Sequence, residues 1–372
     1  MSWLSELDIF IFGLTLLLFI GEYMEYTPKE IKVFRVINCV VIITVLVFIL
    51  GNLADAKSGE FVSTMEDFTT VFHTLFKYLI FMYNKNNLKE LMDARTERFW
   101  KIPHGNEKLA RKIRNIYKGV NIVQVVMLAD VVPVIEIYFL TPYFNPSNIF
   151  IFPSNVFVNS VVMDAFVLFC QYYFASFVAF IVVGYDFIYL SLCTELRVQV
   201  KLLKYKLREV FTKTSEDPVS GISICVEYHH FLLSIYERMQ KMYSSTLLFH
   251  YFVSLVTVCF DMYQSFVGES HLSHELLKFL MLAAIIAQLA FYCVPAELLS
   301  SEFTDIAQAL YMSKWYKHKP DVQKLMLPIM VKCQRPHFFS AAGLMEINLD
   351  AFGSVIRRAF SFCAVIRNVL DK

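Results

Sequence analysis

Seven long apolar stretches, separated by polar loops, constrain the fold of this chain more than any other feature. As a helix, each is long enough to cross a hydrocarbon core about 30 Å thick. The 57% content of hydrophobic residues agrees with an all-α membrane protein. The seven predicted transmembrane helices are Ile31 to Leu53, Phe61 to Tyr83, Val120 to Leu140, Val161 to Cys193, Thr246 to Val267, Leu276 to Leu299 and Ala342 to Ile366.

The basic residues of the loops give these spans an orientation. Ten Lys or Arg residues lie in 84–118, eight lie between spans four and five, and six lie between spans six and seven. The intervening loops hold Lys57 alone, with none in 141–164 or 268–275. Because basic loops stay on the cytoplasmic side of a membrane, we predict a cytoplasmic N-terminus and an extracellular C-terminus. This topology is inverted relative to a G-protein-coupled receptor.

The last predicted span carries a polar seam that starts at Glu346. On a helix turning 100° per residue, five further polar residues lie within about 80° of Glu346. They are Asp350, Ser354, Arg357, Ser361 and Asn368. Polar groups at membrane depth face protein or a water-filled cavity. The seam therefore favours either a pore wall, where several copies of this helix face one axis, or a packing stripe against helices of the same chain.

Three regions follow from this pattern. Residues 1–299 hold an N-terminal segment and spans one to six, 300–341 form a cytoplasmic helical anchor, and 342–372 hold the seventh helix. The apolar segment from Ile9 to Ile20 is too short to span comfortably, which favours an interfacial or re-entrant segment. Helical spacing through about 195–245 predicts that spans four and five extend into the cytoplasm as helices.

An amphipathic stripe lies beyond Pro320 in the predicted anchor. Its apolar residues are Val322, Leu325, Met326, Ile329 and Met330, with Cys333 at the end. Such a stripe is either a packing face within the chain or a subunit interface, and periodicity alone does not separate the two.

Several classes of function lack support in the sequence. The eight cysteines form no CxxC pair and the nine histidines do not gather at ligand spacing, so we predict no metal site. Neither a Ser-His-Asp arrangement, an HExxH motif nor a phosphate-binding loop is present, so we predict that the chain is not an enzyme and needs no cofactor. The net charge of +1, without a basic domain, predicts no nucleic-acid partner.

The C-terminal part of the chain resembles the insect odorant receptor family. The matching pieces, in order, are Tyr311-Met-Ser-Lys-Trp315, Pro336, Ala342-Gly343, Leu349, Phe352, Val355 and Ser361-Phe362. The resemblance implies an odorant-gated, non-selective cation channel in the plasma membrane of an olfactory sensory neuron dendrite. It also implies a tetramer with the insect odorant receptor co-receptor. The 195–245 loop lacks room for the long insertion of the co-receptor, which favours an odorant-specific tuning subunit.

The resemblance also implies the residues of the pore. The hydrophobic gate of the family falls on Val365 and Val369, with Asn368 beside it. With the polar seam, the predicted pore and gate residues are Glu346, Asp350, Arg357, Ser361, Val365, Asn368 and Val369. Four copies of Arg357 around one axis would repel cations, and a mixed tetramer would dilute that charge.

A small volatile ligand requires an aromatic pocket with few polar groups. In this family the pocket lies in the outer half of the bundle, between spans two and six. The residues predicted to line it are Phe68, Phe72, His73, Ile135, Tyr138, Phe166, Phe169, Cys170, Tyr173, Phe260, Tyr263, Gln264, Phe279 and Ala283. Of these, Tyr138, Tyr173, His73 and Gln264 are the candidates for hydrogen bonds to the ligand.

Two other classes of membrane protein remain as alternatives. A metabotropic seven-helix chemoreceptor is disfavoured by the inverted charge topology and by the absence of an Asp-Arg-Tyr triplet after span three. A membrane transporter is disfavoured because the chain shows no matched pair of interrupted helices.

Overall fold

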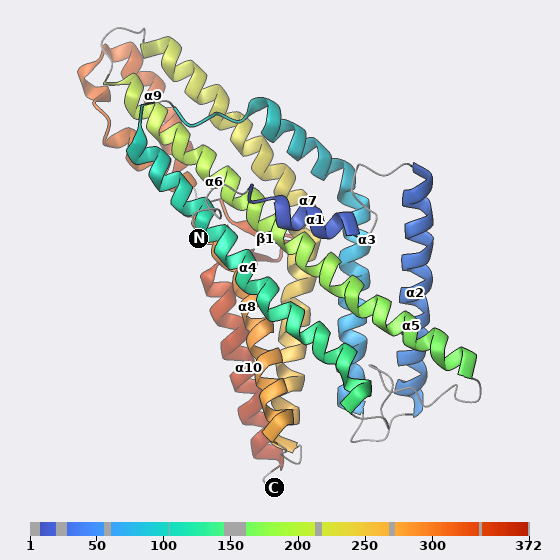
Figure 1. Cartoon of the computed structure of the whole chain (residues 1–372). Helices are drawn as coiled ribbons and strands as arrows, with labels where there is room; N and C mark the ends of the chain where they lie inside the picture. The colour runs from blue at the N-terminus through green and yellow to red at the C-terminus, as the bar shows by residue number, and fades with distance from the viewer. Residues whose placement is uncertain are drawn as a thin grey trace.

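The computed structural model describes residues 8–19, 28–55, 61–103, 105–144, 161–212, 218–267, 272–334 and 337–370. Long helices run side by side along most of the molecule, and one small β-hairpin lies against them (Figure 1). The elements, in chain order, are α1 (Ile11–Phe19), α2 (Pro28–Asp55), α3 (Phe61–Arg98), α4 (Glu107–Phe144), α5 (Val161–Val178), a π-helical turn (Ala179–Val183), α6 (Gly184–Val210), α7 (Pro218–Val267), α8 (Leu272–Tyr311), a 3₁₀ turn (Trp315–Lys317), α9 (Pro320–Cys333), β1 (Phe339–Ala341), β2 (Met345–Ile347) and α10 (Leu349–Leu370).

This nearly all-helical architecture confirms the all-α part of the predicted fold class. Within the described residues, four helical segments are long and apolar enough to cross a membrane. They are Lys32–Ala54, Ala165–Val210, Pro218–Phe260 and Leu282–Lys317. The other three predicted spans correspond to α3, α4 and α10. The count of seven spans and their orientation therefore stay predictions.

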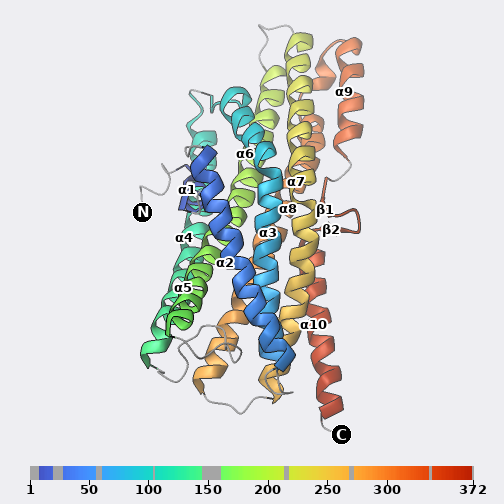
Figure 2. The same cartoon turned by 90° about the vertical axis from the view of Figure 1, so that its right-hand side faces the viewer.

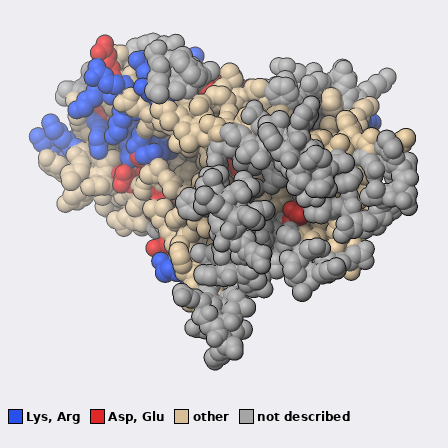
Figure 3. All heavy atoms as spheres, turned by 60° about the horizontal axis from the view of Figure 1, so that its bottom comes forward, with Lys and Arg blue, Asp and Glu red and all other residues tan. Residues whose placement is uncertain are grey.

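Several helices run well beyond the predicted spans toward one end of the molecule. Helix α3 continues to Arg98, α6 to Val210 and α8 to Tyr311, and α7 begins already at Pro218. At this end of the molecule, α9 packs against α7 and α8 (Figure 2). Lys and Arg side chains gather at one end of the described surface in Figure 3. The helical extensions through 195–245 are thus present, as the periodicity indicated.

Helix α6 forms the centre of the bundle. Its side chains from Gly184 to Leu196 are all buried, and it packs against α7 and α8. The predicted N-terminal segment forms α1, which lies across α6 (Figure 1). The two helices approach closely because Gly13 has no side chain: an added Cβ would lie 2.9 Å from Cγ1 of Ile188.

The start of the last helix differs from the prediction. The predicted span began at Ala342, but the helix begins at Leu349, and residues 339–347 form the β-hairpin between α9 and α10 (Figure 2). Ala342 (φ 51°) and Gly343 (φ 75°) take left-handed backbone conformations in the hairpin turn, which end helical geometry there. Asn348 then caps α10 by accepting a hydrogen bond from the Ala351 N–H at 2.8 Å.

Glu346 therefore does not belong to the helical seam. It lies in β2, where its backbone pairs with Ser340 of β1. The hairpin is attached to α7, because Gln240 Nε2 donates to the Ser340 carbonyl (2.6 Å) and Gln240 Oε1 accepts from the Ser340 N–H (2.8 Å). Our placement of Glu346 on the pore-facing stripe of the last helix was wrong.

Candidate functional site

A buried charged pair lies where α3, α6 and α8 meet. Lys77 Nζ donates to both carboxylate oxygens of Asp186, at 2.8 and 3.0 Å, and both side chains are almost fully buried. From α8, Gln288 Nε2 donates to Asp186 Oδ2 at 2.8 Å, and the Tyr292 hydroxyl donates to Oδ1. A buried charge is costly unless it is paired and hydrogen-bonded, and here the carboxylate accepts bonds from three side chains.

The π-helical turn helps to place this carboxylate. Residues 179–183 form the turn directly before α6, and Asp186 follows three residues after its end. One extra residue per turn rotates the following helix relative to the preceding one. The turn therefore rotates α6 about its axis relative to α5, and in this rotation Asp186 faces Lys77.

Two histidines extend the polar cluster toward an aromatic wall. The rings of His73 (α3) and His250 (α7) are 5.4 Å apart, and His250 also lies 4.7 Å from the ring of Tyr292. Phe249 of α7 completes the wall, with its ring 5.5 Å from Phe72 and 6.0 Å from His73. Apolar rings and polar side chains thus meet at one place between α3 and α7.

Some buried polar atoms of this region have no hydrogen-bond partner among the described residues. They are His73 Nε2, His250 Nδ1 and Tyr243 Oη. Unpaired buried donors and acceptors are rare and mark places where water or a ligand completes the bonding. The cluster can therefore bind a small polar group or ordered water.

The structure brings together only part of the predicted ligand pocket. His73 and Cys170 are buried, and Phe68 and Tyr173 are half-buried. Tyr173 Oη donates to Asn38 Oδ1 at 2.7 Å, which joins α5 to α2. Phe260 is half-buried in α7. These residues stay candidates for ligand contacts.

Other predicted pocket residues are exposed on the single chain. Phe72, Phe166 and Phe169 are 42%, 47% and 61% exposed, and Ala283 is exposed as well. Phe166 and Phe169 face the outside of the single chain, so their part in a ligand pocket stays a prediction. The remaining predicted residues lie in helices, but their side chains are outside the described part of the chain; they are Ile135, Tyr138, Tyr263, Gln264 and Phe279.

Helix α10 presents two different faces. Ala351, Val355 and Ala359, spaced four residues apart, are buried against the bundle. Asp350, Arg357 and Ser361 are exposed, so these three members of the predicted seam do not pack inside the chain.

Other parts of the seam do contact the same chain. The Ser354 hydroxyl lies 2.9 Å from Tyr251 Oη of α7, and Arg358 Nη1 donates to that oxygen at 3.5 Å. The seam is therefore a packing contact at one position and an open polar surface at others. The side chains of Val365, Asn368 and Val369 lie outside the described part of α10.

The apolar stripe of α9 is mainly a packing face. Val322 and Met326 are buried at 4% and 0% exposure, and Ile329 and Met330 pack against the same core. Leu325 is 45% exposed. The subunit interface therefore stays a prediction for Leu325 and for Ile329 and Met330, which are only half-buried.

Close to the cytoplasmic end predicted from the charges, Glu302 of α8 holds three basic side chains of α6. Arg197 Nε lies 3.3 Å from Glu302 Oε1, and Lys201 and Lys204 donate to its two oxygens. Glu302 is almost fully buried, whereas Asp305, the second acid bound by Lys204, is exposed. This cluster ties α6 to α8 beyond the apolar part of the bundle.

Comparison with known proteins decides the family. The family model described as 7tm odorant receptor matches residues 57–360. The chain belongs to the 7tm odorant receptor family. Membership in a receptor family confirms the prediction that the chain is not an enzyme. Within the described residues, no group of three or more His, Cys, Asp or Glu could hold a metal ion.

Relatives of this odorant receptor include both tuning receptors and a co-receptor. Odorant receptor 49a of Drosophila melanogaster is 23% identical over 313 residues, which cover 80% of this chain and 78% of the fly protein. The odorant receptor coreceptor of Aedes aegypti is 22% identical over 147 residues, covering 40% of this chain and 31% of the mosquito protein. The longer match supports the tuning branch of the family, as predicted.

A solved structure has the same fold. The olfactory receptor OR5 of Machilis hrabei, in complex with eugenol, superimposes with a TM-score of 0.82. The alignment covers 99% of this chain and 98% of that receptor at 15% sequence identity. The arrangement of helices in this chain is therefore that of a solved olfactory receptor.

Sequence reasoning missed most of the charged cluster. The second predicted span holds Lys77 as well as His73, but the pattern assigned Lys77 no partner and did not single out Asp186, Gln288 or Tyr292. One signal was available: Asp186 is an acid inside the apolar stretch of span four, as Lys77 is a base inside span two. Opposite charges within two predicted spans are expected to pair.

Proposed function

We propose that this chain is the odorant-binding subunit of a non-selective cation channel that works with the insect odorant receptor co-receptor in a tetramer. A small volatile binds in the outer half of the helix bundle, and the last helix lines the pore. The channel would act in the plasma membrane of olfactory sensory neuron dendrites. The observation that carries the proposal is the uncovered polar face of α10.

A polar face of this kind needs water or other protein beside it. Asp350, Arg357 and Ser361 are exposed on a helix whose opposite face, at Val355 and Ala359, is buried in the bundle. Lipid does not solvate charged side chains at membrane depth. Neighbouring subunits around a water-filled axis would solvate this face, and Val365 and Val369 would then form the hydrophobic gate farther along the helix.

The charge of Arg357 supports a mixed assembly. Four copies facing one axis would place four positive charges beside a cation path, and like charges at close distance repel strongly in a low-dielectric environment. Subunits of a co-receptor would lower that charge. The partial similarity to the Aedes aegypti coreceptor is consistent with two chains that share a fold and assemble together.

The ligand site would lie next to the charged cluster, on the side of the aromatic wall. His73 takes part in both, because it lies beside Phe249 and beside His250. Its buried, unpartnered Nε2 can bond a carbonyl or hydroxyl group of a volatile. The solved complex of the Machilis receptor with eugenol, an aromatic volatile with a hydroxyl group, gives a precedent for such a ligand in this fold.

Gating would follow from a difference in affinity between two states. A ligand opens the channel only if it binds the open arrangement more tightly than the closed one. The path from ligand to pore would run through His250 and Tyr251, which are neighbours on α7. His250 contacts the cluster, whereas Tyr251 contacts Ser354 of α10.

Voltage-clamp recording tests this function. Cells would express the chain with and without an insect co-receptor and receive a broad panel of volatiles. A rapid cation current that requires both chains and a particular set of volatiles supports the proposal. Responses that are slow and need a second messenger would point to a metabotropic receptor, and substrate flux without current would point to a transporter.

A further inference from the structure

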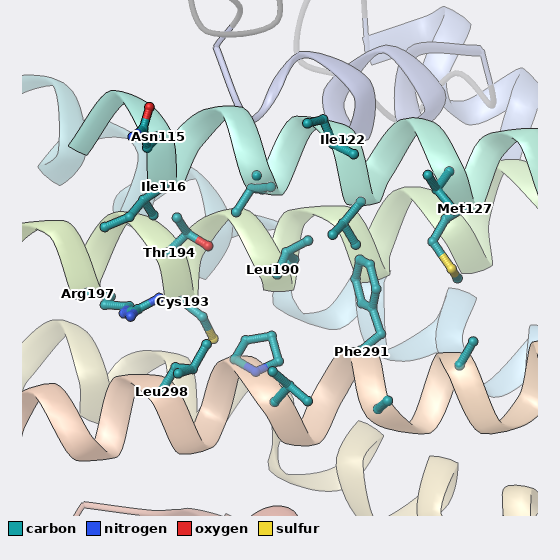
Figure 4. A pocket seen from close by; sticks show the side chains of 18 residues that line it. Asn115, Ile116, Ile122, Met127, Leu190, Cys193, Thr194, Arg197, Phe291 and Leu298 are labelled. Carbon is teal, nitrogen blue, oxygen red and sulfur yellow. The ribbon is translucent and has the colours of Figure 1, made fainter. Parts of the chain in front are cut away.

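An apolar groove runs along the outside of the bundle between α4, α6 and α8 (Figure 4). Its volume is about 620 Å³. The exposed side chains of Val123 and Val126 from α4 and of Val294 and Leu298 from α8 form much of its walls. None of the residues that line the groove belongs to the charged cluster around Asp186, so the groove is a separate site.

The length of the groove matches one leaflet of a bilayer. Its lining on α4 extends from Asn115 to Met127. At 1.5 Å per residue, these twelve steps span about 18 Å. Half of a hydrocarbon core is about 15 Å thick, so an acyl chain of one leaflet would lie along the groove with its headgroup at one end.

Only one end of the groove is polar. Asn115, Thr194 and Arg197 lie together there, while Met127 and Phe291 lie toward the other end (Figure 4). Asn115 lies within the basic segment 84–118 and Arg197 within the basic segment 195–245, so the positive-inside rule places this end of the groove at the cytoplasmic leaflet. That leaflet carries the anionic lipids of a cell membrane.

Positive charge continues past this end along the same side of α4. Lys112 lies four residues before Ile116 and Lys108 four residues before Lys112, so both extend the groove-facing stripe of the helix. Both lysines are exposed. Across from them, Arg197 approaches Glu302 through Nε, which leaves its terminal nitrogens available for a phosphate.

We propose that this groove binds an anionic phospholipid of the cytoplasmic leaflet. One acyl chain lies along the apolar walls, and Lys112 and Arg197 hold the phosphate and the anionic headgroup. A zwitterionic phospholipid has the same acyl chains but no net charge, so it binds more weakly. The site is independent of the odorant pocket.

Native mass spectrometry of the full chain tests the proposal. The protein is exchanged into vesicles with equal amounts of phosphatidylserine and phosphatidylcholine, extracted, and the retained lipids are counted. Wild-type protein is expected to retain phosphatidylserine preferentially. Lys112→Gln should lower that retention about fivefold, from the contribution of about 1 kcal/mol per basic residue near a charged membrane surface. Arg114→Gln, two residues away on the opposite side of α4, should leave it unchanged.

A second pair of variants tests the apolar part of the groove. Nothing lies within 4 Å of a Cβ added at Gly119, so Gly119→Phe can place its ring in the groove without displacing the helix. Loss of phosphatidylserine in Gly119→Phe, but not in Gly119→Ala, supports the proposal. Equal retention of both lipids by the wild type, or unchanged retention in Lys112→Gln and Gly119→Phe, overturns it.

Discussion

Lys77 and Asp186 are separated by 109 residues in the chain, yet they form a buried ion pair at 2.8 Å between α3 and α6. Gln288 and Tyr292 bring α8 to the same carboxylate. One acid thus connects three helices of the bundle, and His250 beside Tyr292 connects it to α7.

Removing one member of this pair should destabilise the receptor strongly. Lys77→Met leaves a buried carboxylate without its cation, which costs about 3–5 kcal/mol. Combining it with Asp186→Asn removes both charges and should restore much of the stability, since Gln288 and Tyr292 can still bond the amide. Melting temperatures of the detergent-solubilised full chain measure both variants. Equal loss in the single and the double variant would contradict this role of the pair.

The Glu302 cluster offers a second test of stability, farther along α6. Glu302→Gln leaves Arg197, Lys201 and Lys204 facing one another without their shared carboxylate. Because Glu302 is almost fully buried, we expect a loss of about 1–3 kcal/mol. Asp305→Asn is the control, since that acid is 53% exposed and exposed pairs contribute at most about 1 kcal/mol. A similar melting temperature for both variants would contradict the argument from burial.

The contact between α1 and α6 depends on the absence of a side chain at Gly13. In Gly13→Ala, the new Cβ would approach Ile188 Cγ1 at 2.9 Å and the Gly184 carbonyl at 3.1 Å. Overpacking of this kind costs about 1–3 kcal/mol. Gly119→Ala meets no neighbour and should raise stability slightly, because Ala favours a helix over Gly. Limited proteolysis of the N-terminal segment, compared between the two variants, reports whether α1 has detached.

His73 should influence which volatiles the receptor detects. In His73→Leu the proposed hydrogen bond to a carbonyl or hydroxyl group of the volatile is lost. A loss of about 1.4 kcal/mol lowers the affinity for such a volatile about tenfold. Responses to apolar volatiles should persist. Concentration–response curves of the receptor with its co-receptor measure this shift. Phe169→Leu, at a position that is 61% exposed, is the control and should leave the curves unchanged. A uniform loss for all volatiles in His73→Leu would contradict a specific polar contact.

The sequence predicted the helices better than their contacts. Apolar stretches near 30 Å long specify helices in a membrane almost by themselves, because unpaired backbone groups are costly in lipid. The hairpin was missed because its turn is marked only by Ala342-Gly343. The long apolar run that follows predicted a helix from Ala342 onward. Once the hairpin forms, Glu346 moves from a predicted helix face to a strand.

Long-range pairing limited the prediction of the site. Periodicity shows which side of a helix is polar, but not which helix lies opposite, so Lys77 had no assigned partner. The phase of α6 depends on the π-helical turn at 179–183, and regular helical spacing does not anticipate such a turn. Phe169 shows the same limit of periodicity: the pattern places it in a helix but does not show that its side chain is 61% exposed on the single chain.

The accessibility of Ser361 tests most directly whether α10 lines the ion path. Ser361→Cys and Val355→Cys would each be expressed with the co-receptor and treated during ligand application with a cationic thiol reagent, with wild-type receptor as the baseline for its native cysteines. Because Ser361 is exposed and Val355 is fully buried, the current should fall strongly in Ser361→Cys and stay at the baseline in Val355→Cys. An unchanged current in Ser361→Cys, with the protein at the cell surface, would contradict the account.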